Sequence, residues 1–471
     1  MGVSMSGLRS VDLLVPNEIS FRLAHLPRLT VAVIAAEFAG MLKYLLAVGV
    51  VGWCLVSVPA GNAADWPRWR GPNGSGHVPA GINVPASLPN ELKPVWKIDV
   101  GEGVSSPVIS GGWVVFMEKR NEKEVLTALN AENGNRVWSE VIDDSFEDTQ
   151  GIGPRCTPMV DGDRVYAQSR KGELQCRRIV DGRILWRKNF VRDFEALFIG
   201  EKSDPVAVGA IRHGYNGSPV IDGDGLIVIA GGTNNASVVK LIKQSGTTIW
   251  KSQSDAPGYA PATIATIGGV KQAVIFTADG VIGLKLADGN LLWRFPIKTT
   301  WARHVTTPTI AGDLVMVSSH QHGLFGIRIA KDGTGQKAEQ AWLTKDAAIN
   351  FSSPVIVGQH LYGLGPAKNL ICVETQTGKI AWSKDGYITT SGGQAHAAFV
   401  VMGKNILTLT DGGELVLFPA DPVGFKQISR VQICGSTWCN PAYSDGKLFV
   451  RDGIGKKNIT SHLLCVDLLK K

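Results

Sequence analysis

The stretch Asp288-Gly289-Asn290-Leu291-Leu292-Trp293 decides the fold, because its pattern recurs along the chain. Each copy has a glycine four residues before a tryptophan, and an alternating apolar run lies just upstream. The other glycine and tryptophan pairs are Gly134 with Trp138, Gly182 with Trp186, Gly246 with Trp250, and Gly378 with Trp382. Self-similarity at roughly 40–50 residues is typical of a solenoid or a propeller.

A second signal recurs out of phase with the first, and consists of a proline that opens a short apolar run. These prolines are Pro107, Pro158, Pro219, Pro261, Pro308, Pro354 and Pro441. Proline can begin a strand because the first residue need not donate to the hydrogen-bond ladder. Turns rich in glycine and aspartate follow most of these runs, and such turns suit tight hairpins because they tolerate positive φ.

The unit that begins at Pro308 illustrates a repeat of four strands. Its first strand is expected at about 308–311 and its second at 314–318, with a third near 324–329 and a fourth near Trp342. Eight such units of roughly 47 residues occupy 95–471, and only the one near 395–401 lacks the proline. The sequence therefore predicts an all-β, eight-bladed β-propeller of four-stranded antiparallel blades.

The last unit supplies only three strands, and the chain before the first unit supplies a candidate for the fourth. This candidate is Pro94-Val95-Trp96-Lys97-Ile98, which we expect to pair with the strand near 463–468. Such an N-terminal strand closes the ring and removes exposed sheet edges. The tryptophans at this place in each unit are expected to pack across the seams between blades, the alternative being stacking on a sugar or cofactor. They are Trp96, Trp138, Trp186, Trp250, Trp293, Trp342 and Trp382.

Residues 1–64 have the pattern of a secretory signal. Met41-Leu42-Lys43 precedes the apolar run 44–58, and small residues lead to Ala64. We expect translation to begin at Met41, with residues 1–40 a mis-called extension and a mature N-terminus near Ala64 or Asp65. The alternative is an uncleaved membrane anchor. Either way we expect the chain to be exported, to the periplasm or beyond, and residues 65–94 to form an extended segment before the propeller.

Charge and cysteine content narrow the class of protein. The formal net charge is +7, without a long block of one sign, so the sequence does not favour a nucleic-acid partner. Cys176, Cys372 and Cys465 occupy equivalent apolar strands in different units, so we expect them to be buried and inert. Cys434 and Cys439 are close enough for a disulfide or a free pair, and both alternatives remain open.

The repeat Gln376-Thr377-Gly378-Lys379-Ile380-Ala381-Trp382 resembles the pyrroloquinoline-quinone (PQQ) repeat, with its Asp/Thr-Gly-Lys-x-x-Trp pattern. The resemblance covers most of the chain after about Asp65. The head Asp65-Trp66-Pro67-Arg68-Trp69-Arg70-Gly71-Pro72-Asn73-Gly74 is also similar to the opening of secreted PQQ-like propeller proteins of unknown role. The family includes quinoprotein alcohol dehydrogenases and a scaffold lipoprotein of outer-membrane β-barrel assembly, so the fold alone does not decide the function.

The resemblance also implies which cofactor, metal ion and residues a dehydrogenase of this family would need. Such enzymes hold PQQ over the axis with a Ca²⁺ ion bound by carboxylate and amide oxygens, an Asp base and often a Cys-Cys pair. This sequence has no Cys-Cys dipeptide and no Cys-x-x-Cys-His haem site. Its loop carboxylates match no family motif; they include Asp143, Asp144, Glu147, Asp148 and Asp204.

The candidate site follows from the topology of the blades. The turns between first and second strands and between third and fourth strands lie on one face, and they are short. The long connections lie on the other face, where binding usually occurs. The segments before each first strand should converge on the channel mouth. The predicted ligand-binding residues there are Arg155, His213, Tyr215, Asn216, Arg303, His304, Asn350, His396, Trp438 and Asn440.

Tyr259 and Gln394 also lie in the segments that should converge on the channel mouth, and His320 and His322 lie in a neighbouring loop. This polar funnel suits an anionic or hydroxylated ligand. The alternative is that its side chains bind backbone groups or water. His304, His320 and His322 are also a weak candidate for a metal site.

Two functions follow from the sequence. The first is an exported scaffold that binds a protein or polymeric partner through its loop face, without chemistry and without a cofactor. The second is a PQQ- and Ca²⁺-dependent alcohol or sugar dehydrogenase. The missing catalytic markers favour the first function, and membrane contact is expected only through an uncleaved signal.

Overall fold

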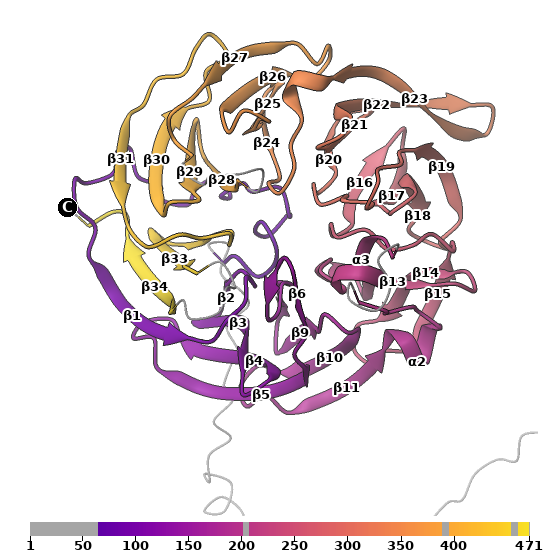
Figure 1. The fold of residues 1–471 in the computed structure, drawn as a ribbon, viewed down its shortest axis with the longest axis horizontal. Helices are drawn as coiled ribbons and strands as arrows, with labels where there is room; N and C mark the ends of the chain where they lie inside the picture. The colour runs from indigo at the N-terminus through magenta and orange to yellow at the C-terminus, as the bar shows by residue number, and fades with distance from the viewer. Residues whose placement is uncertain (1–64, 201–206, 389–394, 454–459, 471) are drawn as a thin grey trace, which may run out of the picture. The chain divides into compact units, whose positions relative to one another are not determined.

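A computed structural model describes residues 65–470, except 201–206, 389–394 and 454–459. Among these residues, eight four-stranded antiparallel sheets form the blades of a β-propeller around a central channel (Figure 1). The predicted eight-bladed fold is therefore confirmed. The predicted signal or anchor and Gln394 lie outside the described residues. No helix in the described part of the chain is long and apolar enough to cross a membrane.

Each blade has four strands, here termed A to D from the channel outward. The A strands are β2 (Val108–Ser110), β8 (Met159–Asp161), β12 (Val220–Asp222), β16 (Thr263–Ile267), β20 (Thr309–Ala311), β24 (Val355–Val357), β28 (Ala397–Met402) and β32 (Ala442–Ser444). The B strands are β3 (Trp113–Arg120), β9 (Arg164–Gln168), β13 (Gly225–Gly232), β17 (Val270–Phe276), β21 (Leu314–Ser319), β25 (His360–Leu364), β29 (Asn405–Thr410) and β33 (Lys447–Arg451).

The two outer rows complete the blades. The C strands are β4 (Lys123–Asn130), β10 (Glu173–Arg178), β14 (Ala236–Ile242), β18 (Gly280–Lys285), β22 (Gly323–Asp332), β26 (Leu370–Glu374), β30 (Glu414–Pro419) and β34 (Ser461–Asp467). The D strands are β5 (Arg136–Asp144), β11 (Ile184–Asn189), β15 (Thr248–Ser252), β19 (Leu291–Pro296), β23 (Gly335–Thr344), β27 (Ile380–Lys384), β31 (Ser429–Gln432) and β1 (Pro94–Val100).

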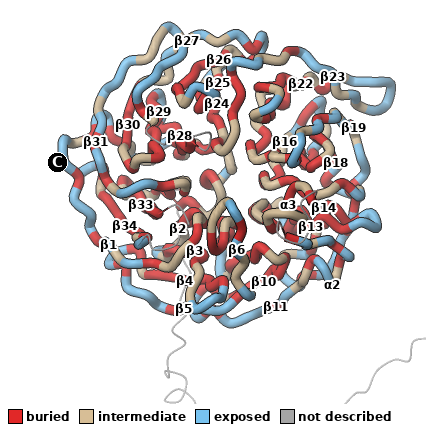
Figure 2. The backbone as a smooth tube through the Cα atoms, in the orientation of Figure 1, coloured by how far each residue is buried: buried red, intermediate tan, exposed pale blue. Residues whose placement is uncertain are grey.

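The connections hold the few remaining elements, which are β6 (Glu147–Asp148), β7 (Gly151–Ile152), α2 (Phe190–Phe194), α3 (Gly209–His213) and η1 (Lys345–Ala347). The core lies between the middle strands of neighbouring blades. Every residue of β21 and β29 is buried, whereas in the outer strand β5 only Trp138 and Ile142 are buried (Figure 2). The strands are β-branched and apolar where both of their faces are covered, as expected for sheets packed on both sides.

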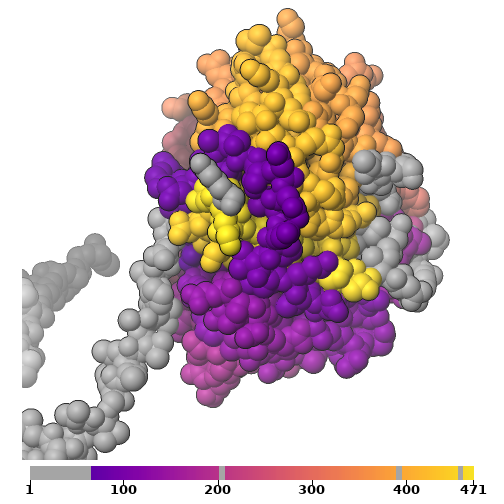
Figure 3. All heavy atoms as spheres, turned by 90° about the vertical axis from the view of Figure 1, so that its left-hand side faces the viewer, coloured from indigo at the N-terminus to yellow at the C-terminus, as the bar shows by residue number. Residues whose placement is uncertain are grey.

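The ring closes as predicted, because β1 pairs with β34 antiparallel to it. Trp96 lies opposite Cys465, and Ile98 lies opposite Leu463. Figure 3 shows the indigo N-terminal segment crossing the yellow C-terminal strands on the outer side of this blade. The last blade is thus built from both ends of the described chain.

The recurring glycine and tryptophan meet across the seams between blades. The Trp138 ring lies against Gly182 in the next blade, so close that a Cβ at Gly182 would be 2.8 Å from the ring. Trp138 Nε1 also donates to the Ile179 carbonyl, at 2.7 Å. The same stacking joins Trp96 to Gly134, Trp186 to Gly246, Trp250 to Gly289, and Trp342 to Gly378. The structural role predicted for these tryptophans is therefore confirmed.

Trp293 follows a different plan, because the next blade lacks the glycine motif. Trp293 Nε1 donates to Gln272 Oε1 within its own blade, at 2.6 Å. In that next blade, β22 and β23 extend to Asp332 and from Gly335, so the prediction of a C strand ending near residue 329 was too short. The long hairpin is held to its neighbour by Gln336 Nε2, which donates to the Ile267 carbonyl at 2.8 Å.

Residues 65–93 form the head segment, which runs inside the ring as far as Val78 and then passes to the outside, where the Leu88 amide donates to Ser429 Oγ in β31. They contact the innermost part of five blades, and these blades lie on opposite sides of the axis, so the head segment crosses the channel (Figure 1). The paired residues are Trp66 with Ile109, Pro67 with Val160, Trp69 with Thr307, Arg70 with Pro354, and Val78 with Val401. Asp65 Oδ2 accepts from the Gly111 amide at the A–B turn, which places the entry on that face.

All six described cysteines are free. Cys176, Cys372 and Cys465 are fully buried in their strands, as predicted. Cys434 and Cys439 also remain thiols, so the bridged alternative is not the one formed here.

Candidate functional site

The D–A connections of all eight blades meet in a cavity of about 230 Å³ at the mouth of the channel. We call this cavity the cup. Its described lining consists of Val104, Gln150, Arg155, Arg212, His213, Asn216, Ser218, Tyr259, Pro261, Trp301, Arg303, Val305, Phe351, His396 and Trp438, with Trp69 from the head segment. Because the head segment crosses the channel from the A–B face, Trp69 forms the floor of the cup.

Six of the ten residues predicted for the site line the cup. They are Arg155, His213, Asn216, Arg303, His396 and Trp438. Tyr215, His304, Asn350 and Asn440 are not among the lining residues. A role in ligand binding stays a prediction for each of the ten.

Tyr215 and His304 are packed into the blades instead. The Tyr215 hydroxyl donates to the Leu197 carbonyl at 2.8 Å. His304 stacks on Phe276 with ring centroids 4.1 Å apart, and its Nδ1 lies 2.6 Å from the Thr277 carbonyl oxygen. Burial lowers the pKa of His304 to about 4, so the ring is neutral at physiological pH. Both residues therefore pack behind the wall of the cup and do not line it.

The described structure supplies no ligand set for the metal site considered at His304, His320 and His322. His322 Nε2 lies 2.7 Å from the Lys298 carbonyl oxygen, so this nitrogen donates to the backbone. The ring of His304 is likewise committed to a carbonyl oxygen. Within the described ranges, no group of three or more His, Cys, Asp or Glu side chains could hold a metal ion.

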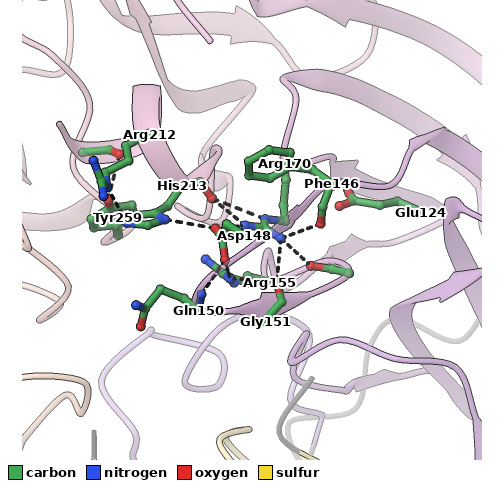
Figure 4. Close-up of polar contacts among 12 residues, drawn as sticks. Glu124, Phe146, Asp148, Gln150, Gly151, Arg155, Arg170, Arg212, His213 and Tyr259 are labelled. Carbon is green, nitrogen blue, oxygen red and sulfur yellow. Dashed lines mark hydrogen bonds and ion pairs between the residues drawn. The ribbon is translucent and has the colours of Figure 1, made fainter. Parts of the chain in front are cut away.

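Asp148 in the β6–β7 hairpin organises one wall of the cup (Figure 4). Its buried carboxylate accepts from Arg155 Nη2 at 2.7 Å and from His213 Nδ1 at 3.0 Å, and it forms an ion pair with Arg170. Burial alone would raise the pKa of Asp148, but the hydrogen bond from His213 and the two arginine charges outweigh it. Together they hold the pKa well below its usual range. Asp148 is thus a fixed anion that positions two cup residues.

Both ring nitrogens of His213 are engaged. Nδ1 donates to Asp148, and Nε2 accepts from Arg212 Nε at 3.2 Å. A general base needs a free nitrogen within reach of the proton that it removes. In this arrangement His213 bridges the hairpin and α3.

Arg170 anchors the same hairpin from the interior. It donates to the carbonyl oxygens of Phe146 at 2.8 Å and His213 at 2.9 Å, and its guanidinium lies over the Phe146 ring. Its backbone amide donates to Glu124 Oε2 at 3.0 Å. Burial raises the pKa of Glu124 to about 7, although the charge of Arg170 opposes the shift. Sequence reasoning named Asp148 only as an unmatched carboxylate and missed Arg170 entirely.

The opposite wall carries a cation without a polar partner. Among the described residues, Arg303 forms no hydrogen bond or ion pair, and its guanidinium lies 5.6 Å from the centre of the Phe351 ring. Phe351 stacks on Trp438, with centroids 5.9 Å apart and the planes at 14°. Nearby, Arg212 lies over Trp301, 4.4 Å from its ring centre. Positive charge and flat rings thus both line the mouth.

Two buried polar atoms of the lining residues have no hydrogen-bond partner within the described part of the chain. They are His396 Nδ1 and Asn216 Oδ1. The His396 side chain is about 95% buried, with a relative exposure of 5%, and burial lowers its pKa to about 4. Unpartnered buried groups of this kind are costly, which makes them candidates for contact with a ligand or water.

Comparison with known families places the chain among propellers of related sequence. The family described as outer membrane protein assembly factor BamB matches residues 90–208 and 207–384. The chain belongs to this family.

BamB of Yersinia pestis is 25% identical over 248 residues, which cover 48% of this chain and 55% of that protein. BamB of Moranella endobia (strain PCIT) is 24% identical over 283 residues, covering 57% of this chain and 68% of that protein. The match thus spans little more than half of the Yersinia protein. The crystal structure of BamB from Moraxella catarrhalis has the same fold, with a TM-score of 0.53 at 16% identity, over 80% of this chain and 99% of that one.

The cup does not fit the calcium and quinone centre that the dehydrogenase hypothesis requires. Ca²⁺ takes several oxygen ligands, of which carboxylates are the usual anionic members. The described lining residues include no aspartate or glutamate. Asp148, which lies behind the wall, is already bound by two arginines and a histidine.

Several lining residues escaped sequence reasoning. Arg212 and Phe351 are direct neighbours of His213 and Asn350, so a wider window around each expected loop residue would have included them. Trp69 had no such signal, because the head segment lies outside the repeats. Its only mark was the dense run of tryptophan and arginine in Asp65–Gly74.

Proposed function

We propose that this chain is an exported scaffold propeller, which holds a protein or polymeric partner at the mouth of the cup and catalyses no reaction of its own. The observation that carries the proposal is the chemistry of the cup wall. Arginines and aromatic rings offer binding, whereas His213 and Asp148, the pair suited to proton transfer, are saturated by each other and by arginines. Membership of the assembly-factor family supports the same conclusion.

The relatives are named outer membrane protein assembly factors, and we extend this class of task to the chain. Such a role needs a location outside the cytoplasm, which the signal-like pattern of residues 41–64 supplies. Mass spectrometry of the protein from its native cell should find an N-terminus near Ala64 or Asp65. A protein that retains Met1 would contradict the proposed export by a cleaved signal.

A photo-crosslinking experiment tests the proposed binding face. A benzophenone amino acid replaces Trp301, which lies at the cup mouth and is 36% exposed. The matched control is the same group at Val423, which is 91% exposed in the β30–β31 connection on the opposite face. We expect a discrete adduct with an envelope protein from position 301 and none from 423. No adduct at 301, or the same adduct at both, would refute a partner at the loop face.

The dehydrogenase hypothesis is tested by the same purified protein. Addition of PQQ and Ca²⁺ should leave no quinone absorption band with the protein after desalting, because the described cup offers no carboxylate to the ion. A retained band together with dye reduction in the presence of alcohols would replace the scaffold proposal with an enzymatic one.

A further inference from the structure

The head segment carries two arginines inside the ring that have no acidic partner. Arg68 and Arg70 flank Trp69, the floor of the cup, but neither arginine lines the cup itself. Arg70 is only 4% exposed. Burial lowers the pKa of both guanidinium groups to about 10, and among the described residues no carboxylate opposes that shift. Buried charges are normally paired, because removing an ion from water is costly, so this pair calls for a counter-ion.

The guanidinium groups keep most of their donors available. The side chain of Arg68 forms no hydrogen bond, ion pair or ring contact with any described residue, and its buried Nε has no partner. Arg70 uses only Nη2, which donates to the carbonyl oxygens of Ser75, at 3.3 Å, and of Pro354. A guanidinium group binds an oxyanion through paired, charge-assisted hydrogen bonds. Arg68 is therefore the side chain of the head segment best placed to bind one.

Both side chains fold back onto one tight turn, residues 68–76, which we call the head turn. A Cβ at Gly74 would lie only 2.5 Å from Arg68 Nη2, so this nitrogen takes up the space of the missing side chain. Arg70 Nη2 lies 3.4 Å from the corresponding position of Gly76. An anion bound to Arg68 therefore lies in the field of Arg70 as well.

The backbone of the head turn supplies further donors. The amides of Asn73 and Ser75 have no hydrogen-bond partner in the described part of the chain. Arg70 has φ +58° and Gly71 has φ +82°, so the chain enters the turn through two left-handed residues. Turns of this kind can gather amide groups into a concave surface that binds anions. Arg70 adopts the left-handed region without being a glycine, which is the kind of backbone strain that occurs at functional sites.

The surroundings of the head turn favour a small ion over a large ligand. Asn73 is exposed, so solvent reaches the turn. Gly76 is packed so closely against two blades that a Cβ would be 2.9 Å from Val355 Cγ1 and 3.1 Å from the Phe399 carbonyl oxygen. With Arg70 buried beside it, the turn has little room for a substituent on the anion.

We propose that the head turn binds a small inorganic oxyanion of the phosphate class, held by Arg68 and the turn amides in the field of Arg70. The ion balances the two buried charges and thereby fixes the head segment across the channel. Because the head segment joins blades on opposite sides of the axis, the ion stabilises the whole ring. The site lies outside the cup, and it stands or falls independently of the scaffold function.

Calorimetry on the purified full chain tests the site, with inorganic phosphate as the probe in a chloride buffer of constant ionic strength. We expect a single phosphate per chain and about tenfold weaker binding by Arg68→Met, because charge-assisted hydrogen bonds are lost. Glycerol 1-phosphate should bind clearly more weakly than free phosphate, because the packed turn leaves no room for its glycerol group. Absence of phosphate binding, or full affinity in Arg68→Met, would overturn the proposal. Equal affinity for the ester would overturn the assignment to a free ion.

Thermal unfolding gives an independent readout. Low millimolar phosphate should raise the unfolding temperature of the wild type by binding only the folded chain, and it should leave Arg68→Met unchanged. In chloride buffer the variant should unfold at the wild-type temperature or above it, since Arg68 loses no described polar partner and a buried charge is removed. A lower unfolding temperature would show that another group of the protein holds Arg68, and the site would be wrong.

Arg328→Met is the control for a general loss of positive charge. Arg328 forms an exposed ion pair with Asp313 at 2.6 Å, and it belongs to a blade strand rather than to the head segment. This variant should bind phosphate as the wild type does and show the same rise in unfolding temperature. If phosphate stabilised the wild type and Arg68→Met equally, the effect would be the general one of an excluded salt, which would also refute the site.

Discussion

At the scale of single residues, the glycine of each repeat is explained by the tryptophan of the blade before it. Gly246 has φ +72° and its missing Cβ would lie 2.8 Å from the Trp186 ring. Gly312 has a similar φ of +64° but nothing within 4 Å of its missing Cβ. The two turns therefore separate the cost of positive φ from the cost of a clash with the tryptophan ring.

We predict that Gly312→Ala lowers the free energy of unfolding by about 1 kcal/mol, the usual penalty for a Cβ in this region. Gly246→Ala should lower it by about 2–4 kcal/mol, because overpacking against the tryptophan is added. Urea denaturation followed by tryptophan fluorescence measures both. Equal losses would mean that the ring does not press on the glycine.

The buried carboxyl of Glu124 makes a prediction about pH. A glutamic acid in an unfolded chain has a pKa of about 4.3, whereas burial raises the pKa of Glu124 to about 7. Between these values the folded protein keeps a proton that the unfolded chain has released, so the free energy of unfolding falls as pH rises from 5 to 8.

Glu124→Gln carries no charge at any pH, and it should remove a decline of about 2–4 kcal/mol between pH 5 and pH 8. Urea denaturation at the two pH values measures the difference. Glu132→Gln, at an exposed turn position, is the control and should retain the wild-type decline. A Glu124→Gln variant with the full decline would show that another group binds the proton.

At the scale of the strand and blade, most of the fold could be predicted because the sequence of each repeat marks where its turns lie. Gly, Asp and Pro mark the ends of strands, and alternation or unbroken apolar runs mark their length. The hairpin of β22 and β23 was predicted too short because its turn, with Gly333 at φ +57°, lies within a polar stretch that reads as loop. Only the contact of Gln336 with the neighbouring blade reveals the extension.

The candidate site was harder to predict than the blades. Topology placed the D–A loops at one mouth, which brought Arg155, His213 and Arg303 to the cup. It could not tell which loop residue turns inward, because His304 stacks on Phe276 while its neighbour Arg303 lines the cavity. It also could not place Trp69, since nothing in a repeat pattern predicts that a preceding segment returns through the channel.

The prediction at the scale of the blade concerns the one that closes the ring, which β1 completes. Trp96 is only 8% exposed, stacks on Gly134 and donates to the Ala131 carbonyl at 2.9 Å, so it fastens β1 to the next blade. Trp382 is half-buried and lies against Phe418 and Phe425 instead. Trp96→Ala should cost about 3–5 kcal/mol of unfolding free energy, and Trp382→Ala clearly less. Chemical denaturation of both variants measures this, and a costlier Trp382→Ala would contradict the special role of the closure.

At the scale of the whole molecule, the ring is closed by hydrogen bonds and packing rather than by a described disulfide. All six described thiols are free, and five of them are fully buried. Burial raises the pKa of Cys176, Cys372 and Cys439 to about 11. A thiol reacts as its thiolate, so these groups are protected both by lack of access and by protonation.

The stability of the ring should therefore not depend on the redox state of its cysteines, even in an oxidising compartment. With Cys54 replaced by serine, a disulfide-exchange dye at pH 8 should label almost no thiol in the folded protein and six in concentrated urea. A reductant should leave the unfolding temperature unchanged. Four thiols in urea, with a lower unfolding temperature after reduction, would show that two cysteines are bridged. Cys434 and Cys439 would be the first pair to examine, because Trp438 between them lines the cup and a bridge would stiffen that wall.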